Sequence, residues 1–194
     1  MRRLMLLRHA KTEHDAPSGQ DQDRRLDDRG RLDAAAVGTW IGRHPPLPGA
    51  VLVSTAVRAR QTWEIASQSI IASQAMTDAI GEQRGSARAE WQVEFVADIY
   101  GAEPTQLLQI IRMAEATGPG HLLLVGHNPG MHELALMLTG SGDAAAKKAI
   151  EDNLPTAGLA ILDFDTDDWN DVAFRRGKLV RFTSPKLLKL TSDD

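Results

Sequence analysis

The chain has 194 residues, of which 42% are hydrophobic and 25% charged, and its formal net charge is -4 at pH 7. These values are typical of a globular protein of ordinary domain size and argue against a general nucleic-acid binder, which is usually basic. The sequence contains no cysteine, which excludes disulfides, thiolate nucleophiles and cysteine-ligated zinc. No apolar stretch is long enough for a secretory signal or a membrane span. We therefore expect a cytoplasmic protein that binds neither nucleic acid nor a membrane.

The first predicted element is a short strand at about residues 3–8. Its apolar run, Leu4-Met5-Leu6-Leu7, is typical of a strand that is buried on both faces of a parallel sheet. Arg8 and His9 follow this run directly. Ligands of open α/β sheets bind beyond the carboxyl ends of the strands. The strand is thus expected to deliver a fixed cation and a candidate nucleophile to a binding crevice.

Strands and helices alternate along the rest of the chain. After a polar loop at 14–28 the pattern predicts a helix up to the proline-rich segment 45–49, followed by a strand at 51–54 and a helix at 57–69. A strand at 93–96 and a helix from Pro104 come next, and then a strand at 121–126 and a helix at 129–138. Residues 139–156 are expected to form a loop or short helix whose role is not assigned, and two late antiparallel strands follow at 159–162 and 179–182. This alternation predicts one domain over residues 1–194. The expected fold is a three-layer α/β/α sandwich, with a mostly parallel central sheet and a late antiparallel edge.

Two further strand ends carry residues that can bind an anion. Arg58 lies in the first turn of the helix after the second strand, where the helix dipole does not favour a cation, so an anionic partner would explain it. His127 lies between the fourth strand and Pro129, where helix N–H groups form a natural anion site. Taken alone, each residue is better explained by solvation or local packing. Together with Arg8 and His9, they predict one anion site at one edge of the sheet.

At this point five segments form a recognisable pattern: Leu6 to Lys11, Leu26 to Gly30, Ser54 to Thr62, Val125 to Gly130 and Pro155 to Gly158. With them the sequence resembles the histidine phosphatase superfamily, the phosphoglycerate-mutase-like group whose signature is Arg-His-Gly after the first strand. Within that group it most resembles the compact SixA-type phosphohistidine phosphatases. Ala10 stands where the signature has glycine. Because alanine is also small, we do not expect this change to abolish activity.

The resemblance implies a role for each residue of the predicted site. His9 would be the nucleophile that carries the phosphoryl group as a covalent intermediate, with its pKa lowered by the nearby Arg8 and Arg58. Arg8 and Arg58 would bind the phosphate, because a guanidinium fork matches two phosphoryl oxygens. His127 would donate a hydrogen bond to the same group, assisted by Asn128. Neither a metal nor a cofactor is implied, since the arginines supply the positive charge.

The general acid is less well defined. Larger relatives use a glutamate after the third strand to protonate an alcohol leaving group, and here Glu82, Glu94 and Asp98 lie in that region. We favour Asp98, because it lies just beyond the predicted strand at 93–96. Glu94, inside an alternating strand, would more readily face solvent or a helix.

The leading functional hypothesis is dephosphorylation of phosphohistidine in a phosphorylated protein. The compact chain leaves little room for a large helical cap, and an open pocket suits a protruding protein histidine. Imidazole also leaves phosphorus more readily than an alkoxide, so this substrate depends less on a strong acid. One alternative is a phosphomonoesterase for a small phosphorylated metabolite, a sugar phosphate or nucleotide. A second alternative is a non-catalytic phosphate-recognition module, although a pure binder has no need of a nucleophilic His9.

Overall fold

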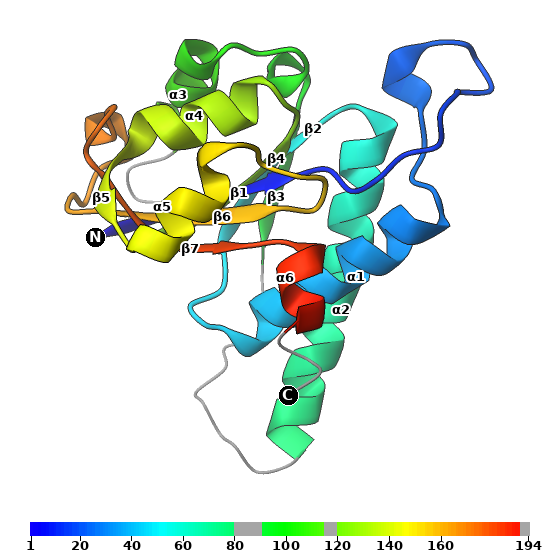
Figure 1. Ribbon diagram of the computed structural model, residues 1–194, viewed down its shortest axis with the longest axis horizontal. Coiled ribbons are helices and arrows are strands. Elements are labelled where there is room, and N and C mark those ends of the chain that lie inside the picture. The colour runs from blue at the N-terminus through cyan, green and yellow to red at the C-terminus, as the bar shows by residue number, and fades with distance from the viewer. Residues whose placement is uncertain (80–90, 115–119, 191–194) are drawn as a thin grey trace.

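A computed structural model describes residues 1–79, 91–114 and 120–190, and its centre is a seven-stranded sheet with the strand order β3-β2-β4-β1-β6-β7-β5 (Figure 1). The strands are β1 (Arg2–Arg8), β2 (Ala50–Ser54), β3 (Gln92–Val96), β4 (His121–Gly126), β5 (Thr139–Gly142), β6 (Leu159–Phe164) and β7 (Gly177–Thr183). β1 to β4 are mutually parallel. The predicted antiparallel pairing of the two late strands, β6 and β7, is confirmed.

The position of the antiparallel strand differs from the predicted late edge. β6 runs antiparallel to β1 on one side and to β7 on the other, so it lies inside the sheet. β5 pairs parallel to β7 and forms the edge of the sheet on that side. β6 is therefore the one strand of the described sheet that runs against the others.

Helices cover both faces of the sheet and complete the predicted α/β/α sandwich. One face carries α1 (Asp28–Arg43) and α2 (Val57–Ala79), and the short α6 (Pro185–Leu190) packs against α1. The opposite face carries α3 (Pro104–Arg112), α4 (Gly130–Leu138) and α5 (Ala144–Glu151) (Figure 1). No helix among the described residues is both long and apolar enough to cross a membrane.

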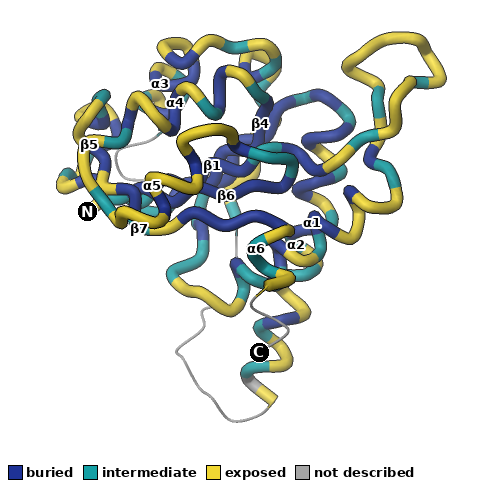
Figure 2. Tube along the Cα trace, viewed as in Figure 1, coloured by how far each residue is buried: buried dark blue, intermediate teal, exposed yellow. Residues whose placement is uncertain are grey.

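The apolar run of β1 is explained by burial on both faces. Leu4 and Leu6 pack into the core under α3 and α4, whereas Met5 and Leu7 pack into the core under α1 and α2. All four side chains are at most 2% exposed, and Figure 2 shows this strand inside the molecule. Alternate side chains of a strand point to opposite faces, so a strand between two helical layers must be apolar throughout. The core therefore fixes the position at which β1 ends.

The segment Asp27-Asp28-Arg29-Gly30 starts α1 and joins it to the chain after β1. The Asp27 carboxylate caps the helix by accepting a hydrogen bond from the Gly30 N–H at 2.7 Å. A Cβ atom at Gly30 would lie 2.0 Å from the Lys11 carbonyl oxygen. Only glycine permits this approach, and the segment therefore has a structural role beside the site.

Two elements differ from the sequence prediction. α2 continues to Ala79 rather than ending at Ser69, because residues 70–79 contain neither glycine nor proline. Residues 139–156 contain β5 as well as the short helix α5. The Thr-Gly-Ser-Gly sequence of β5 lacks apolar alternation, and its strand geometry comes from pairing with β7. Tertiary pairing, rather than local preference, determines this strand.

Candidate active site

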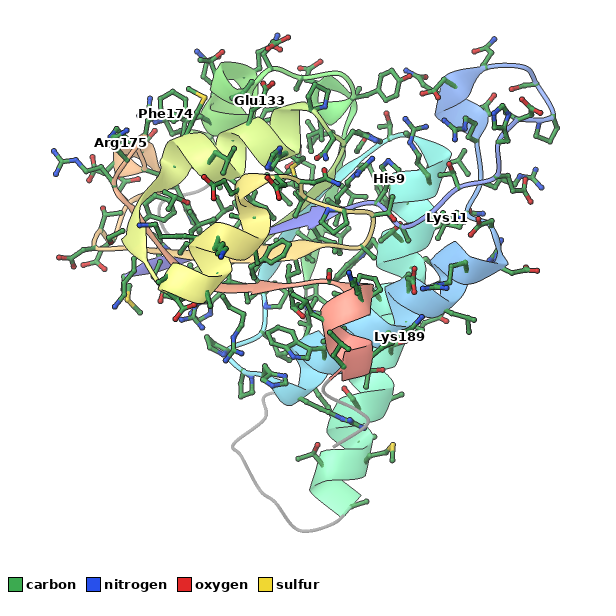
Figure 3. All side chains as sticks on the ribbon, viewed as in Figure 1. His9, Lys11, Glu133, Phe174, Arg175 and Lys189 are labelled. Atoms are coloured by element: carbon green, nitrogen blue, oxygen red, sulfur yellow. The ribbon has the colours of Figure 1, made fainter. Side chains whose placement is uncertain are left out.

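The carboxyl ends of β1, β2 and β4 bring together Arg8, His9, Arg58 and His127. The ring centroids of His9 and His127 are 5.2 Å apart, and Arg8 and Arg58 lie close enough to lower the pKa of both rings. His9, Arg58 and His127 are 9%, 6% and 8% exposed. Figure 3 marks His9 where β1 meets the following segment. Residues predicted from three separate strand ends thus lie in one buried site.

His9 presents an unprotonated ring nitrogen. Its Nδ1 lies 2.7 Å from the Ala10 carbonyl oxygen, which can only accept a hydrogen bond, so Nδ1 carries the proton of the neutral ring and Nε2 keeps its lone pair. The pKa of His9 is lowered to about 3, mainly by burial and to a smaller extent by His127, Arg58 and Arg8, whereas the hydrogen bond with the Ala10 carbonyl opposes the shift. The sequence prediction gave the right direction for this pKa, but burial has a larger effect than the arginines.

Hydrogen bonds through the Thr62 hydroxyl link the residue after His9 to the first turn of α2. The Ala10 N–H donates to the Thr62 hydroxyl at 3.0 Å, and that hydroxyl donates to the Arg58 carbonyl at 2.7 Å. Ala10 is fully buried in the core under α1 and α2, so its methyl group is accommodated where the signature has glycine. The segment after β1 and the first turn of α2 are therefore held together.

Arg8 is held by the loop that precedes β6. Its Nη1 donates to the Leu154 carbonyl at 3.0 Å, and the Asn128 amide donates to the same carbonyl at 2.9 Å and to Asn153 at 3.2 Å. The Nε of Arg8 is buried and has no hydrogen-bond partner among the described residues. Burial, and then the charge of Arg58, lower the pKa of Arg8. Two like charges are thus held close together, as a site for a dianion requires.

Arg58 is paired with an acidic side chain of the protein, a contact that the sequence did not predict. Asp21, in a short 3-10 helix of the segment between β1 and α1, accepts from Arg58 Nη1 through its carbonyl at 2.7 Å and from Nη2 through its carboxylate at 2.9 Å. Tyr100 donates to the same carboxylate at 2.7 Å. This bond, followed by those from Arg24 and Arg58, lowers the pKa of Asp21 to about 2. Arg58 Nε is buried and, within the described chain, has no partner.

His127 is paired with the last residue of β2. Its Nε2 lies 2.7 Å from the Ser54 hydroxyl, and Ser54 is fully buried. Burial, and then Arg58, lower the pKa of His127 to about 4, so this ring is also neutral at pH 7. If the Ser54 hydroxyl donates to Nε2, the ring proton lies on Nδ1, which is buried without a partner in the described part of the chain. That nitrogen can donate to a bound anion.

Comparison with known proteins identifies the family of this chain. Residues 4–107 match the family model of the histidine phosphatase superfamily (branch 1), a range that contains Arg8, His9 and Arg58. The chain belongs to the histidine phosphatase superfamily. This histidine phosphatase is 35% identical over 184 residues to Rv1276c, a Mycobacterium tuberculosis protein described as uncharacterised, covering 93% of this chain and 100% of the relative.

Solved structures of histidine phosphatases share the fold. A candidate phosphohistidine phosphatase SixA from Agrobacterium tumefaciens is 27% identical, with a TM-score of 0.70 over 95% of this chain and 99% of the other. The predicted resemblance to the SixA-type subgroup is thereby confirmed. Mycobacterial glucosyl-3-phosphoglycerate phosphatase Rv2419c, 15% identical with a TM-score of 0.56 over 90% of this chain and 97% of that one, shares the fold alone.

Three residues of this histidine phosphatase site were not singled out from the sequence: Asp21, Ser54 and Tyr100. Ser54 ends β2 and Tyr100 follows the 3-10 helix after β3, so the rule that placed Arg8 and His127 at strand ends could have identified both. Asp21 had no such signal. It is one of several acidic residues in a polar segment, and only the fold of that segment brings it to Arg58.

The three acid candidates have different positions. Asp98 lies in the 3-10 helix Ala97–Ile99 directly after β3, and its side chain is exposed. Glu94 lies in β3 and is also exposed, whereas Glu82 lies outside the described residues. Asp98 stays the preferred candidate because it lies at the same end of the sheet as the site. No group of three or more histidine, aspartate and glutamate side chains in the described ranges could hold a metal ion.

Proposed function

We propose that this histidine phosphatase transfers a phosphoryl group from a protein phosphohistidine to His9 and then hydrolyses the covalent intermediate. One observation carries the proposal: a neutral His9 with its Nε2 unprotonated lies beside two arginines and His127. Buried nitrogen atoms of Arg8, Arg58 and His127 have no partner within the described residues. Buried donors without a partner are rare in folded proteins, and a tetrahedral oxyanion would satisfy them.

In the first step the lone pair of His9 Nε2 attacks phosphorus, and the bond from phosphorus to the substrate nitrogen breaks. The electron pair of that bond leaves with the substrate imidazole, which departs as a neutral ring when its other nitrogen carries a proton. Arg8 and Arg58 bind the phosphoryl oxygens, and His127 donates from Nδ1 because Ser54 occupies Nε2. In the second step water attacks the phosphoryl group, which releases phosphate and regenerates His9.

The supporting residues have distinct roles in this proposal. Asn128 uses its amide to hold the loop at Asn153 and Leu154, so it fixes the carbonyl that orients Arg8. The two guanidinium groups neutralise the phosphoryl charge, and for this reason we propose a transfer that needs no metal ion. Asp98 would act as the general acid when the leaving group is an alkoxide. A protein phosphohistidine depends less on that acid, and this favours it as the substrate.

The proposed intermediate can be trapped directly. Rapid mixing of the protein with a labelled phosphohistidine peptide should yield an acid-labile, alkali-stable phosphoenzyme that is absent from His9→Ala. His9→Ala should lower turnover at least about 10³-fold, because the nucleophile is lost. His14→Ala is the matched control, since the His14 side chain is 98% exposed. Oxyanion binding without any phosphoenzyme in the unmodified protein would show a recognition module instead.

The substrate class is tested by parallel turnover assays. The protein should hydrolyse a phosphohistidine peptide faster than glucose 6-phosphate or a nucleoside monophosphate. If only the sugar phosphate or the nucleotide is hydrolysed, the protein is a small-molecule phosphomonoesterase. In that case the assignment of His9 would stand and the assignment of the substrate would fail.

A further inference from the structure

Tyr100 contacts three groups of the site. Its hydroxyl donates to Asp21 Oδ2 at 2.7 Å, and its ring centroid lies 5.7 Å from the guanidinium carbon of Arg58. Its ring and the His127 ring form a T-shaped pair, with centroids 5.4 Å apart and an interplanar angle of 81°. It is also the only tyrosine in the sequence. A single side chain after β3 thus connects the segment carrying Asp21 with residues from β2–α2 and β4–α4.

One atom, Asp21 Oδ2, bridges the Tyr100 hydroxyl and the Arg58 guanidinium. Asp21 Oδ2 accepts from both Tyr100 and Arg58 Nη2, while the Asp21 carbonyl accepts from Arg58 Nη1. Both terminal nitrogens of the guanidinium are therefore held on the Asp21 side. Nε is the guanidinium nitrogen that is buried without a partner among the described residues, and each terminal nitrogen keeps a second N–H. The rotation of the guanidinium plane, and hence the direction of Nε, depends on where Asp21 lies.

Asp21 has little packing of its own to fix its position. Residues 17–23 are exposed, the Asp21 side chain is 50% exposed, and Figure 2 shows this segment standing out from the buried centre. Tyr100, in contrast, follows Ile99, which is 2% exposed and belongs to the core under α3 and α4. The bond from Tyr100 therefore ties an exposed carboxylate to a fixed part of the fold.

We propose that Tyr100 is a positioning residue: through Asp21 it sets the orientation of the Arg58 guanidinium for binding the phosphoryl group. Binding by a guanidinium fork is directional, so a rotation of the plane loses hydrogen bonds even though the charge is unchanged. Tyr100 acts through Arg58 and makes no bond to the phosphoryl group. This inference rests on the proposed function only in requiring that the site binds a phosphoryl-like oxyanion.

The decisive variant is Tyr100→Phe, which removes the hydroxyl but keeps the ring and the net charge. Tungstate is the probe, because it is a tetrahedral oxyanion that binds without turnover. By titration calorimetry, Tyr100→Phe should weaken tungstate binding about three- to ten-fold, the size of one ordinary hydrogen bond, because the lost bond acts on the oxyanion only through Arg58. The KM for a phosphohistidine peptide should rise by a similar factor, with an unchanged melting temperature.

A double-mutant cycle tests the route through Asp21. In the Asp21→Asn background, Tyr100→Phe should have no further effect on tungstate binding, because the acceptor that links the two residues is already altered. Ser18→Ala is the matched control: Ser18 donates to Asp23 at 2.6 Å in the same segment but has no bond to Arg58. Equal weakening by Ser18→Ala would show that general order of the segment, and not Tyr100, matters.

The remaining outcomes decide the proposal. Unchanged tungstate binding in Tyr100→Phe would overturn it, and tighter binding would show that Asp21 competes with the substrate for Arg58. The bond itself is visible in an absorbance titration at 295 nm, since Asp21 raises the pKa of the single tyrosine and Asp21→Asn should lower it. An unchanged phenol titration would also count against the proposal. If the protein binds tungstate but hydrolyses no phosphohistidine peptide, the proposed substrate fails while this test still gives an answer.

Discussion

His9 and Asp21 both belong to the active site, but the chain holds them by different means. His9 follows a strand whose apolar residues are at most 2% exposed, and His127 follows the equally buried β4. Asp21 lies in an exposed segment and is held by hydrogen bonds to Arg58, Arg24 and Tyr100. Arg58 contacts both parts. The comparison teaches that the core places His9 and His127, the proposed reacting groups, whereas a residue of an exposed segment is bonded to Arg58, which we propose binds the phosphoryl group.

The largest effect of breaking this arrangement is expected at Arg58. Lysine keeps the positive charge but cannot bond Asp21 and a phosphoryl oxygen with one planar fork, so Arg58→Lys should lower kcat/KM about 10²-fold. Arg60→Lys is the matched control, because Arg60 lies in the same helix and stacks on Phe95 at 4.8 Å, outside the site. Wild-type turnover by Arg58→Lys would mean that a point charge is sufficient.

The two buried histidines, His9 and His127, should make the free energy of unfolding depend on pH. His9 and His127 have pKa values of about 3 and about 4 in the folded protein, against about 6.5 in an unfolded chain. Between the folded and unfolded pKa values the unfolded chain binds more protons than the folded protein. The stabilisation from the two neutral rings is therefore fully present above about pH 6.5 and is lost as the pH is lowered. Each histidine should cost on the order of 2 kcal/mol between pH 7 and pH 5.

Urea denaturation at pH 7 and pH 5 measures this loss of stability. The double variant His9→Gln/His127→Gln should lose less stability over this interval than the unmodified protein, because glutamine does not titrate. The Asp21 carboxylate, whose pKa is about 2, does not contribute in this interval. An equal loss in both proteins would show that the two rings are not buried in the neutral form.

A smaller effect on activity is expected at Ser54, whose hydroxyl contacts His127. Ser54→Ala removes the hydroxyl that lies 2.7 Å from His127 Nε2, and kcat should fall about ten-fold, the size of one ordinary hydrogen bond, because the ring is no longer held in one tautomer. Ser73→Ala provides the control, because Ser73 is also buried and bonds only the Ile70 carbonyl of its own helix. If Ser54→Ala raises KM without lowering kcat, the hydroxyl contributes to binding and not to transfer.

The smallest effect on turnover of a phosphohistidine peptide is expected at the exposed Asp98. Asp98→Asn should leave turnover of a phosphohistidine peptide within about three-fold of wild type. Hydrolysis of an alkyl phosphate should fall about 10²-fold, because the alkoxide leaving group loses its proton donor. Glu94→Gln, assayed in parallel, examines the other described candidate. Full activity of Asp98→Asn on the alkyl phosphate would exclude Asp98 as the acid.

The sequence predicted those parts of the molecule that local pattern determines. The run Leu4-Met5-Leu6-Leu7 indicated a strand buried on both faces, and the polar residues after such strands identified Arg8, His9, Arg58 and His127. β5 was not predicted because glycine and serine carry no apolar period, and its strand forms only by pairing with β7. The interior position of β6 was missed for a related reason, since strand order depends on long-range pairing.

The same limit applies to the site. Asp21 could not be separated from the neighbouring acidic residues, because its role depends on how an exposed segment folds back onto Arg58. Ser54 was quoted within a motif, but its bond to His127 requires the spatial order of β2 and β4. Loop conformation and sheet register are set by contacts distant in sequence, and a single sequence does not display them.

The direction of β6 has a consequence for the order in which the protein is made. Because β6 runs against β1, its first residue, Leu159, pairs with Leu7, and the loop before it arrives beside Arg8. A nascent chain that has left the ribosome only as far as α4 already carries all four reacting side chains. It still lacks the Leu154 carbonyl that orients Arg8. The proposed site is therefore complete only when the segment from Leu154 through β6 has been synthesised and has paired with β1.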